Sequence, residues 1–210
     1  MTLLLPRGYS AESELEIRRS RFITRLARVD SEDAARAVIA SVRTTYPDAR
    51  HHCTAFIIHV PDAQPIERSS DDGEPAGTAG MPMLEVLRGS GLSNVVAVVT
   101  RYFGGVLLGT GGLVRAYSDS VTAAVSGTPR VRPVVRRLVG LEVDAAEAGR
   151  VQGALMNRGV DVVDADWGGA SVLLTLSVDD PGAALPLVRE VAQSDVDLVP
   201  LGEQVHEVPA

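Results

Sequence analysis

Residues 69–117 read SSDDGEPAGTAGMPMLEVLRGSGLSNVVAVVTRYFGGVLLGTGGLVRAY. Two glycine-rich turns, 73–80 and 104–112, flank an apolar strand predicted for Val95–Val99, and they lead into helical patterns at 79–88 and 113–125. Glycine at this density supplies positive φ angles or lets another group approach the backbone closely. We therefore expect a second segment of the protein, or a ligand, to lie against these turns.

The second turn is a candidate anion site. It contains the GxxxxG half of a phosphate-binding loop, but Thr110 stands where that loop needs a lysine, and it does not match GxGxxG of a nicotinamide-binding unit. Gly109, Gly111 and Gly112 can still expose successive backbone amides at a helix start, which attracts anions, and Arg101 and Arg115 add positive charge. The alternative interpretation is that the glycines let this helix pack tightly on the strand.

Three carboxylates, those of Asp71, Asp72 and Glu74, lie in the loop before the first helix. Together they can hold a magnesium ion or orient a substrate hydroxyl. They can equally accept hydrogen bonds from the amides of their own loop, because Asp is common in turns for that reason. Thr78 is the predicted cap of the following helix.

Arginines cluster near the start of the chain, and the strand predicted for 22–29 places alternate residues on opposite faces. Arg21 and Arg25 share one face, close to Arg19. Two interpretations remain: a solvated sheet edge, or a patch that faces an anionic ligand or RNA. A helix follows, with Ser31 as its N-cap and Pro47 just after its end.

The run His51, His52 and Cys53 contains metal-ligating residue types at the start of a predicted strand, 53–60. Adjacent strand residues point to opposite faces, and no second CxxC or HxxxH pair completes four ligands. We therefore expect no metal site here, and instead a histidine that hydrogen-bonds to a neighbouring loop.

Composition limits the chemistry of the 210-residue chain. It is 45% hydrophobic and 22% charged, as in soluble globular proteins, and no apolar run approaches the length of a membrane span. One cysteine allows no internal disulfide, so we expect a cytoplasmic protein. All 20 basic residues are arginine, which excludes a Schiff-base lysine. No serine or cysteine has an evident catalytic base, so we expect no catalytic residues and no cofactor.

The net charge of -7 belongs to the second part of the chain. Residues 1–130 contain 14 arginines and 14 acids, whereas residues 131–210 contain 6 arginines and 13 acids. This acidity argues against strong, sequence-blind nucleic-acid binding by the whole chain, although it leaves room for a local arginine surface on the first part.

The run Gly127, Thr128 and Pro129 is the predicted domain boundary, which gives domains of 1–128 and 129–210. Beyond it we predict strands at 134–143, 160–166, 171–178 and 196–201, and helices at 145–158 and 181–193. The order β-α-β-β-α-β is the ferredoxin-like arrangement. The predicted fold class is therefore α+β, with two small sheet-and-helix domains.

Four motifs resemble the YigZ/IMPACT family in its bacterial two-domain form: RRSRFIT from Arg18, HHC from His51, SDDGEPAGTAG from Ser70 and RYFGGVLLGTGGLVRAY from Arg101. The resemblance implies that the first domain has a ribosomal-protein-like β-α-β-α fold, also seen in elongation factor G. The ferredoxin-like domain is similar to the last domain of that factor. By analogy this pairing implies contact with ribosome or RNA. In eukaryotic relatives the shared domain accompanies regulation of translation under nutrient stress, through protein partners.

Three functional hypotheses follow. The first is a non-enzymatic regulator of translation or stress response that binds RNA, the ribosome or a translation-related protein through a face bearing Arg101, Tyr102, Gly104, Gly105 and Arg115. The second is an enzyme or sensor for a small phosphorylated or nucleotide ligand held at 109–112, with magnesium on the three loop carboxylates. The third is a scaffold that binds another protein through the acidic second domain.

Overall fold

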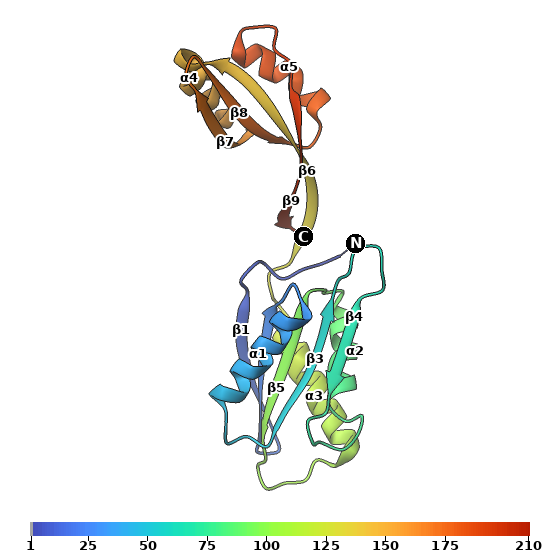
Figure 1. Ribbon diagram of the computed structural model, residues 1–210. Coiled ribbons are helices and arrows are strands. Elements are labelled where there is room, and N and C mark those ends of the chain that lie inside the picture. Colours follow the sequence, from blue (N-terminus) through green and yellow to red (C-terminus); the bar gives the residue numbers. More distant parts are fainter. Residues whose placement is uncertain (1) are drawn as a thin grey trace. The chain divides into compact units, whose positions relative to one another are not determined.

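The computed structural model describes residues 2–210 of the chain, which form an α+β protein (Figure 1). The described residues divide into two compact units, one ending at Arg132 and including Val208–Ala210, the other spanning Pro133–Glu207. The predicted fold class is confirmed. No helix among residues 2–210 is long and apolar enough to cross a membrane.

The first unit is a five-stranded antiparallel sheet with helices on both faces. Its elements are β1 (Ser10–Ile17), β2 (Ser20–Arg28), α1 (Glu32–Thr45), β3 (His51–Ile58), β4 (Ile66–Ser70), α2 (Gly80–Ser90), β5 (Val95–Tyr102) and α3 (Gly109–Val125). The strand order is β1-β2-β5-β3-β4, so the predicted apolar strand β5 is central. The sheet has five strands, three more than the β-α-β-α pattern, and β1 and β4 form its two edges.

Strand alternation divides the core of this unit into two layers. Val95, Ala97 and Val99 of β5 face α2 and α3, whereas Val96 and Val98 face α1. Figure 1 shows α1 on one face of the sheet and α2 and α3 on the other. A central strand buried on both faces needs apolar residues at every position, which explains the unbroken run VVAVV.

Helix α1 begins as predicted. The hydroxyl of Ser31 accepts a hydrogen bond from the Ala34 N–H at 3.1 Å, and Glu32 and Asp33 lie in the first turn. A cap of this kind satisfies one of the helix's free N–H groups.

The second unit has the predicted ferredoxin-like arrangement. It contains α4 (Ala145–Asn157), β7 (Asp161–Gly168), β8 (Ser171–Val178), α5 (Pro181–Ala192) and most of two long strands, β6 (Val131–Asp144) and β9 (Val199–Pro209), whose outer ends belong to the first unit. The sheet order is β7-β8-β6-β9. Its core joins α4 and α5 to alternate residues of β6 and β8. The predicted last strand, 196–201, was wrong in its bounds, because β9 begins at Val199 and continues through Gly202 to Pro209.

Candidate functional site

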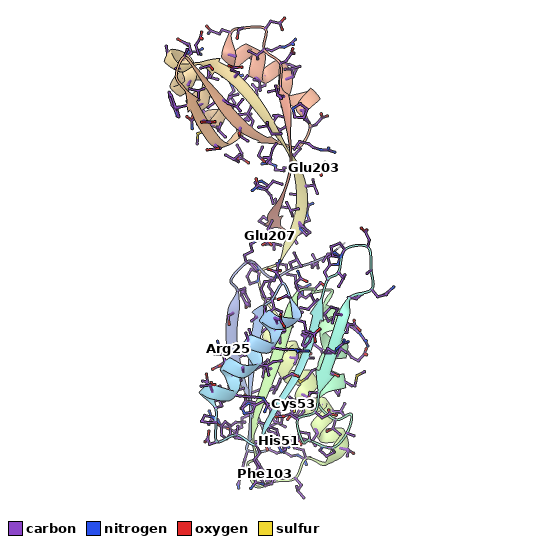
Figure 2. All side chains as sticks on the ribbon, viewed as in Figure 1. Arg25, His51, Cys53, Phe103, Glu203 and Glu207 are labelled. Atoms are coloured by element: carbon purple, nitrogen blue, oxygen red, sulfur yellow. The ribbon has the colours of Figure 1, made fainter. Side chains whose placement is uncertain are left out.

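The sequence motifs converge at one end of the first-domain sheet, and the turns that meet there define what we call the motif end: 18–19, 50–51, 71–80 and 102–112. The register places Arg21 of β2 opposite Tyr102 and His51 of β3 opposite Arg101. Figure 2 shows Phe103 and His51 at this end of the domain, with Arg25 farther along the sheet.

Asp71 organises the first glycine-rich turn. Its Oδ1 accepts hydrogen bonds from the N–H groups of Ala79 and Gly80 at 3.0 and 2.8 Å, and its Oδ2 accepts one from Gly77 at 2.8 Å. Asp71 therefore caps α2, and the prediction that Thr78 does so was wrong. The Thr78 hydroxyl instead donates to the Pro75 carbonyl at 2.7 Å. Burial raises the pKa of the Asp71 carboxyl, but the three N–H donors outweigh it and hold the pKa below its ordinary value.

Asp72 joins the same loop to β3 and α1. Its Oδ2 accepts a hydrogen bond from the His52 N–H, and its Oδ1 one from Arg43, both at 2.6 Å. Burial raises the pKa of Asp72, whereas these two donors lower it, and the net direction is downward. The Asp72 carbonyl lies 2.9 Å from Nδ1 of His51. The expected contact of a strand-start histidine with a neighbouring loop is thus present.

Glu74 lies at the centre of a buried polar cluster. Its Oε1 accepts hydrogen bonds from Nη1 of Arg101 at 2.6 Å and from the Tyr117 hydroxyl at 2.8 Å. The side chains of Arg101 and Glu74 are only 8% and 4% exposed. Burial also raises the pKa of the nearby Cys53 thiol to about 12, which leaves it unreactive. Arg101 is therefore a structural cation, not the exposed one that the sequence suggested.

The three loop carboxylates do not share a site. The interpretation in which they accept from the amides of their own loop holds for Asp71 alone, because Asp72 binds His52 and Arg43 and Glu74 binds Arg101 and Tyr117. Among residues 2–210, no group of three or more His, Cys, Asp or Glu side chains could hold a metal ion.

Gly104 meets another segment of the chain at very short range. A Cβ atom there would lie 2.0 Å from the Arg19 carbonyl, so only glycine fits against the β1–β2 turn. The glycine content predicted a close approach by another segment of the protein or by a ligand, and at Gly104 it is another segment of the same chain. Gly105 and Gly109 have positive φ angles of 83° and 71°, which glycine adopts without strain.

Two of the three glycines at the start of α3, Gly109 and Gly111, have open space beside them, whereas a Cβ at Gly112 would lie 3.1 Å from the Leu108 side chain. Helix α3 begins at Gly109 and has no side-chain cap, and a Cβ at Gly111 would meet no atom within 4 Å. Tight packing of these glycines on the strand, the alternative interpretation, therefore does not describe Gly111. The exposed Thr110 lies beside it in the same first turn.

Two hollows lie at the motif end, and the site residues that the sequence predicted are divided between them. One, of about 470 Å³, is lined by Asp48, Arg50, His51, Arg101, Tyr102, Phe103 and Leu107. The other, of about 520 Å³, is lined by Ile17, Arg18, Leu108, Gly111, Gly112, Arg115, Ala116 and Asp119. Arg101 and Tyr102 thus belong to the first hollow and Gly111, Gly112 and Arg115 to the second. The loop that follows β5 contributes to both.

Exposed arginines without an acidic partner gather at this end. Among the described residues, four at the motif end have no ion pair or hydrogen bond: Arg18, Arg19, Arg50 and Arg115. The arginines of the β2 face are instead paired, Arg21 with Glu14 at 2.7 Å and Arg25 with Glu12 at 2.9 Å. The predicted basic strand face is therefore ion-paired with the acids of β1, the edge strand beside β2, and the free positive charge lies at the turns.

Sequence reasoning missed Arg50 and Phe103 as site residues. Phe103 is 57% exposed, and the Arg101 guanidinium lies 5.8 Å from the centre of its ring. Arg50 directly precedes the HHC motif, and Phe103 lies inside the RYFGG motif, so their positions in those motifs were the available signal.

Comparison with known proteins identifies the family. The model of the Impact N-terminal domain matches residues 18–125, which include the whole motif end. The chain belongs to the IMPACT family. The IMPACT family member YigZ of Escherichia coli is 48% identical over 152 residues, covering 68% of this chain and 73% of the relative. YvyE of Bacillus subtilis, another IMPACT family member, is 41% identical over 146 residues, covering 70% of this chain and 66% of the relative.

A solved structure resembles both domains of this IMPACT family member. It is the crystal structure of a hypothetical protein, 38% identical, with a TM-score of 0.59. The similarity covers 95% of this chain and 97% of that chain. The two-domain α+β architecture is thus shared with an experimentally determined relative.

Proposed function

We propose that this IMPACT family member is a non-enzymatic regulator of translation in the cytoplasm, which binds ribosomal RNA through the motif end of its first domain. The observation that carries the proposal is the group of four unpaired, exposed arginines, Arg18, Arg19, Arg50 and Arg115. The family resemblance supports the role in translation, because in eukaryotic relatives the shared domain accompanies the regulation of translation.

The acids near these arginines form no ion pair with them. Asp48 accepts a hydrogen bond from the Tyr102 hydroxyl at 2.7 Å, and the carboxylates of Asp71, Asp72 and Glu74 bind partners within the domain. Asp119 lines the second hollow together with Arg18 and Arg115 and carries a negative charge there, but it forms no ion pair with either arginine. The four guanidiniums are therefore free to bind an anion, although the whole chain carries a net charge of -7.

Arginine suits such a surface because its planar guanidinium binds a phosphate through two parallel hydrogen bonds. Contacts of this kind position a protein on RNA without reading its sequence. The acidic second domain would be repelled by phosphates, which restricts contact to the first domain.

Sedimentation with ribosomes from the organism's own extract tests the proposal. We expect native protein to pellet with ribosomes at low salt, and a variant with glutamine in place of all four arginines to stay in the supernatant. A matched control has the same change in charge away from the motif end: Arg25→Gln, Arg36→Gln, Arg68→Gln and Arg88→Gln. The proposal is contradicted if the four-arginine variant still pellets with ribosomes, or if the control variant loses ribosome binding to the same extent.

A small phosphorylated ligand is the second candidate, favoured by the uncapped start of α3 beside Arg18 and Arg115. Because the three loop carboxylates are engaged within the domain, we expect such a ligand to bind without magnesium. A rise in melting temperature with nucleotides, equal with and without magnesium, supports this candidate. No rise with any nucleotide excludes it.

A further inference from the structure

We propose that the hollow beside Phe103 is a subsite for one unpaired RNA base, which stacks on the Phe103 ring. This inference rests on the proposed function and narrows it from RNA in general to single-stranded RNA. The subsite is the hollow of about 470 Å³ at the end of β5.

The Phe103 ring is exposed but held in place. Phe103 is 57% exposed, and Val106 and Leu107, which follow it in the same loop, are exposed as well, so the apolar surface here is a cluster and not a single residue. The Arg101 guanidinium lies 5.8 Å from the ring centre of Phe103 and 5.5 Å from that of the buried Phe22. Because Glu74 anchors Arg101 at 2.6 Å, the ring rests on a fixed support and stays open to solvent. A preorganised aromatic surface loses little freedom when a base stacks on it.

The rest of the hollow matches a nucleotide in size and chemistry. Its volume of about 470 Å³ lies within the range of small-ligand sites. Leu107, which is 82% exposed, adds apolar lining next to Phe103, whereas Asp48 and His51 offer polar groups to a base edge. The unpaired Arg50 lies at the same hollow, where it can bind the phosphate of the stacked nucleotide.

Stacking on a protein side chain requires an unpaired base. In a duplex, the faces of the bases are covered by their neighbours, and proteins recognise the backbone instead. Arginines beside an aromatic platform are typical of proteins that bind single strands. The unpaired Arg50 at this hollow favours an anionic occupant over an apolar one, and the exposed ring favours an anion that carries a flat aromatic base, which is a nucleotide of RNA.

Fluorescence anisotropy with the full-length protein tests the subsite. The probes are a fluorescein-labelled 12-nucleotide single-stranded RNA and the duplex of the same sequence. Loss of one base–aromatic stacking contact weakens binding between about 5-fold and 150-fold. We expect that loss for Phe103→Leu on the single strand, little change on the duplex, and near-native binding of both probes by Phe103→Tyr. Leucine keeps the apolar volume and removes only the aromatic face, so it separates stacking from simple packing.

The outcomes distinguish this inference from the proposed function. If Phe103→Leu binds the single strand as tightly as the native protein, the stacking subsite is wrong, while RNA binding through the four arginines stands. Equal native affinity for duplex and single strand overturns the subsite in the same way. Failure of the native protein to bind either probe or ribosomes overturns both. Because Phe103 is more than half exposed, we expect the melting temperature of both variants to stay near the native value, which the same samples can verify.

Discussion

Replacing Arg101 by methionine tests how much the buried polar cluster contributes to the first domain. The substitution keeps an unbranched side chain but leaves the Glu74 carboxylate, which is only 4% exposed, without its cation. Removing one partner of a buried ion pair costs about 3–5 kcal/mol of unfolding free energy. In the double variant Arg101→Met/Glu74→Gln no charge is left unpaired, and the glutamine can still accept from Tyr117. We therefore expect the double variant to recover at least about 1 kcal/mol.

The chain provides an internal control for this measurement. Its single tryptophan, Trp167, lies in β7 of the second domain, so fluorescence reports on that domain, while far-ultraviolet circular dichroism follows both. Urea unfolding of Arg101→Met should shift the first-domain transition in the dichroism signal and leave the Trp167 transition in place. A first-domain loss below about 1 kcal/mol, or an equal shift of both transitions, refutes the reasoning.

Three further predictions concern the same domain. Asp71→Asn should cost about 1 kcal/mol at pH 7, because the amide keeps only one acceptor oxygen and loses the charge-assisted bond from the Gly77 N–H. Because the folded pKa of Asp71 is depressed, this contribution is present above its unfolded pKa of about 3.9. The difference between native and variant in urea unfolding should therefore shrink as the pH falls below 4, and a pH-independent difference contradicts the account. Gly104→Ala should lower the unfolding free energy by about 1–3 kcal/mol through its clash with Arg19, whereas Gly111→Ala should leave it unchanged or raise it by up to about 1 kcal/mol. Thermal unfolding compares the two variants, and a Gly104→Ala variant as stable as the native protein contradicts the account. The Cys53 thiol, with its pKa near 12, should resist a thiol reagent at pH 8 until urea unfolds the domain, and rapid labelling of the native protein would show that it is not buried.

The local sequence pattern predicted those features of the fold that depend only on residues close together in the chain. The alternation from Phe22 to Arg28 placed alternate residues of β2 on opposite faces because the side-chain period of a strand is two. The Ser31 cap of α1 was predictable for the same kind of reason, since its hydrogen bond spans only three residues. The glycine turns correctly indicated close backbone approach.

Long-range partners were not predictable. The segment that lies against Gly104 is Arg19, which local sequence does not reveal. Arg101 appeared to be a surface cation because arginine usually is one, and only the fold places Glu74 beside it. Thr78 is the capping residue type nearest to α2 in the sequence. The loop folds back, however, so that the carboxylate of Asp71, farther upstream, accepts hydrogen bonds from the N–H groups at the start of α2. The pairing of the β2 arginines needed the acids of β1 and their register.

The salt dependence of ribosome binding tests the central claim most directly. Four phosphate contacts predict a slope of about -3 in a plot of log K against log salt, or about 60-fold weaker binding between 50 and 200 mM at constant magnesium. For the variant with glutamine at the four unpaired arginines we expect the slope to approach zero, and for the matched control we expect it to stay near the native value. A native slope near zero, or the same slope in the four-arginine variant, would contradict RNA binding through the motif end.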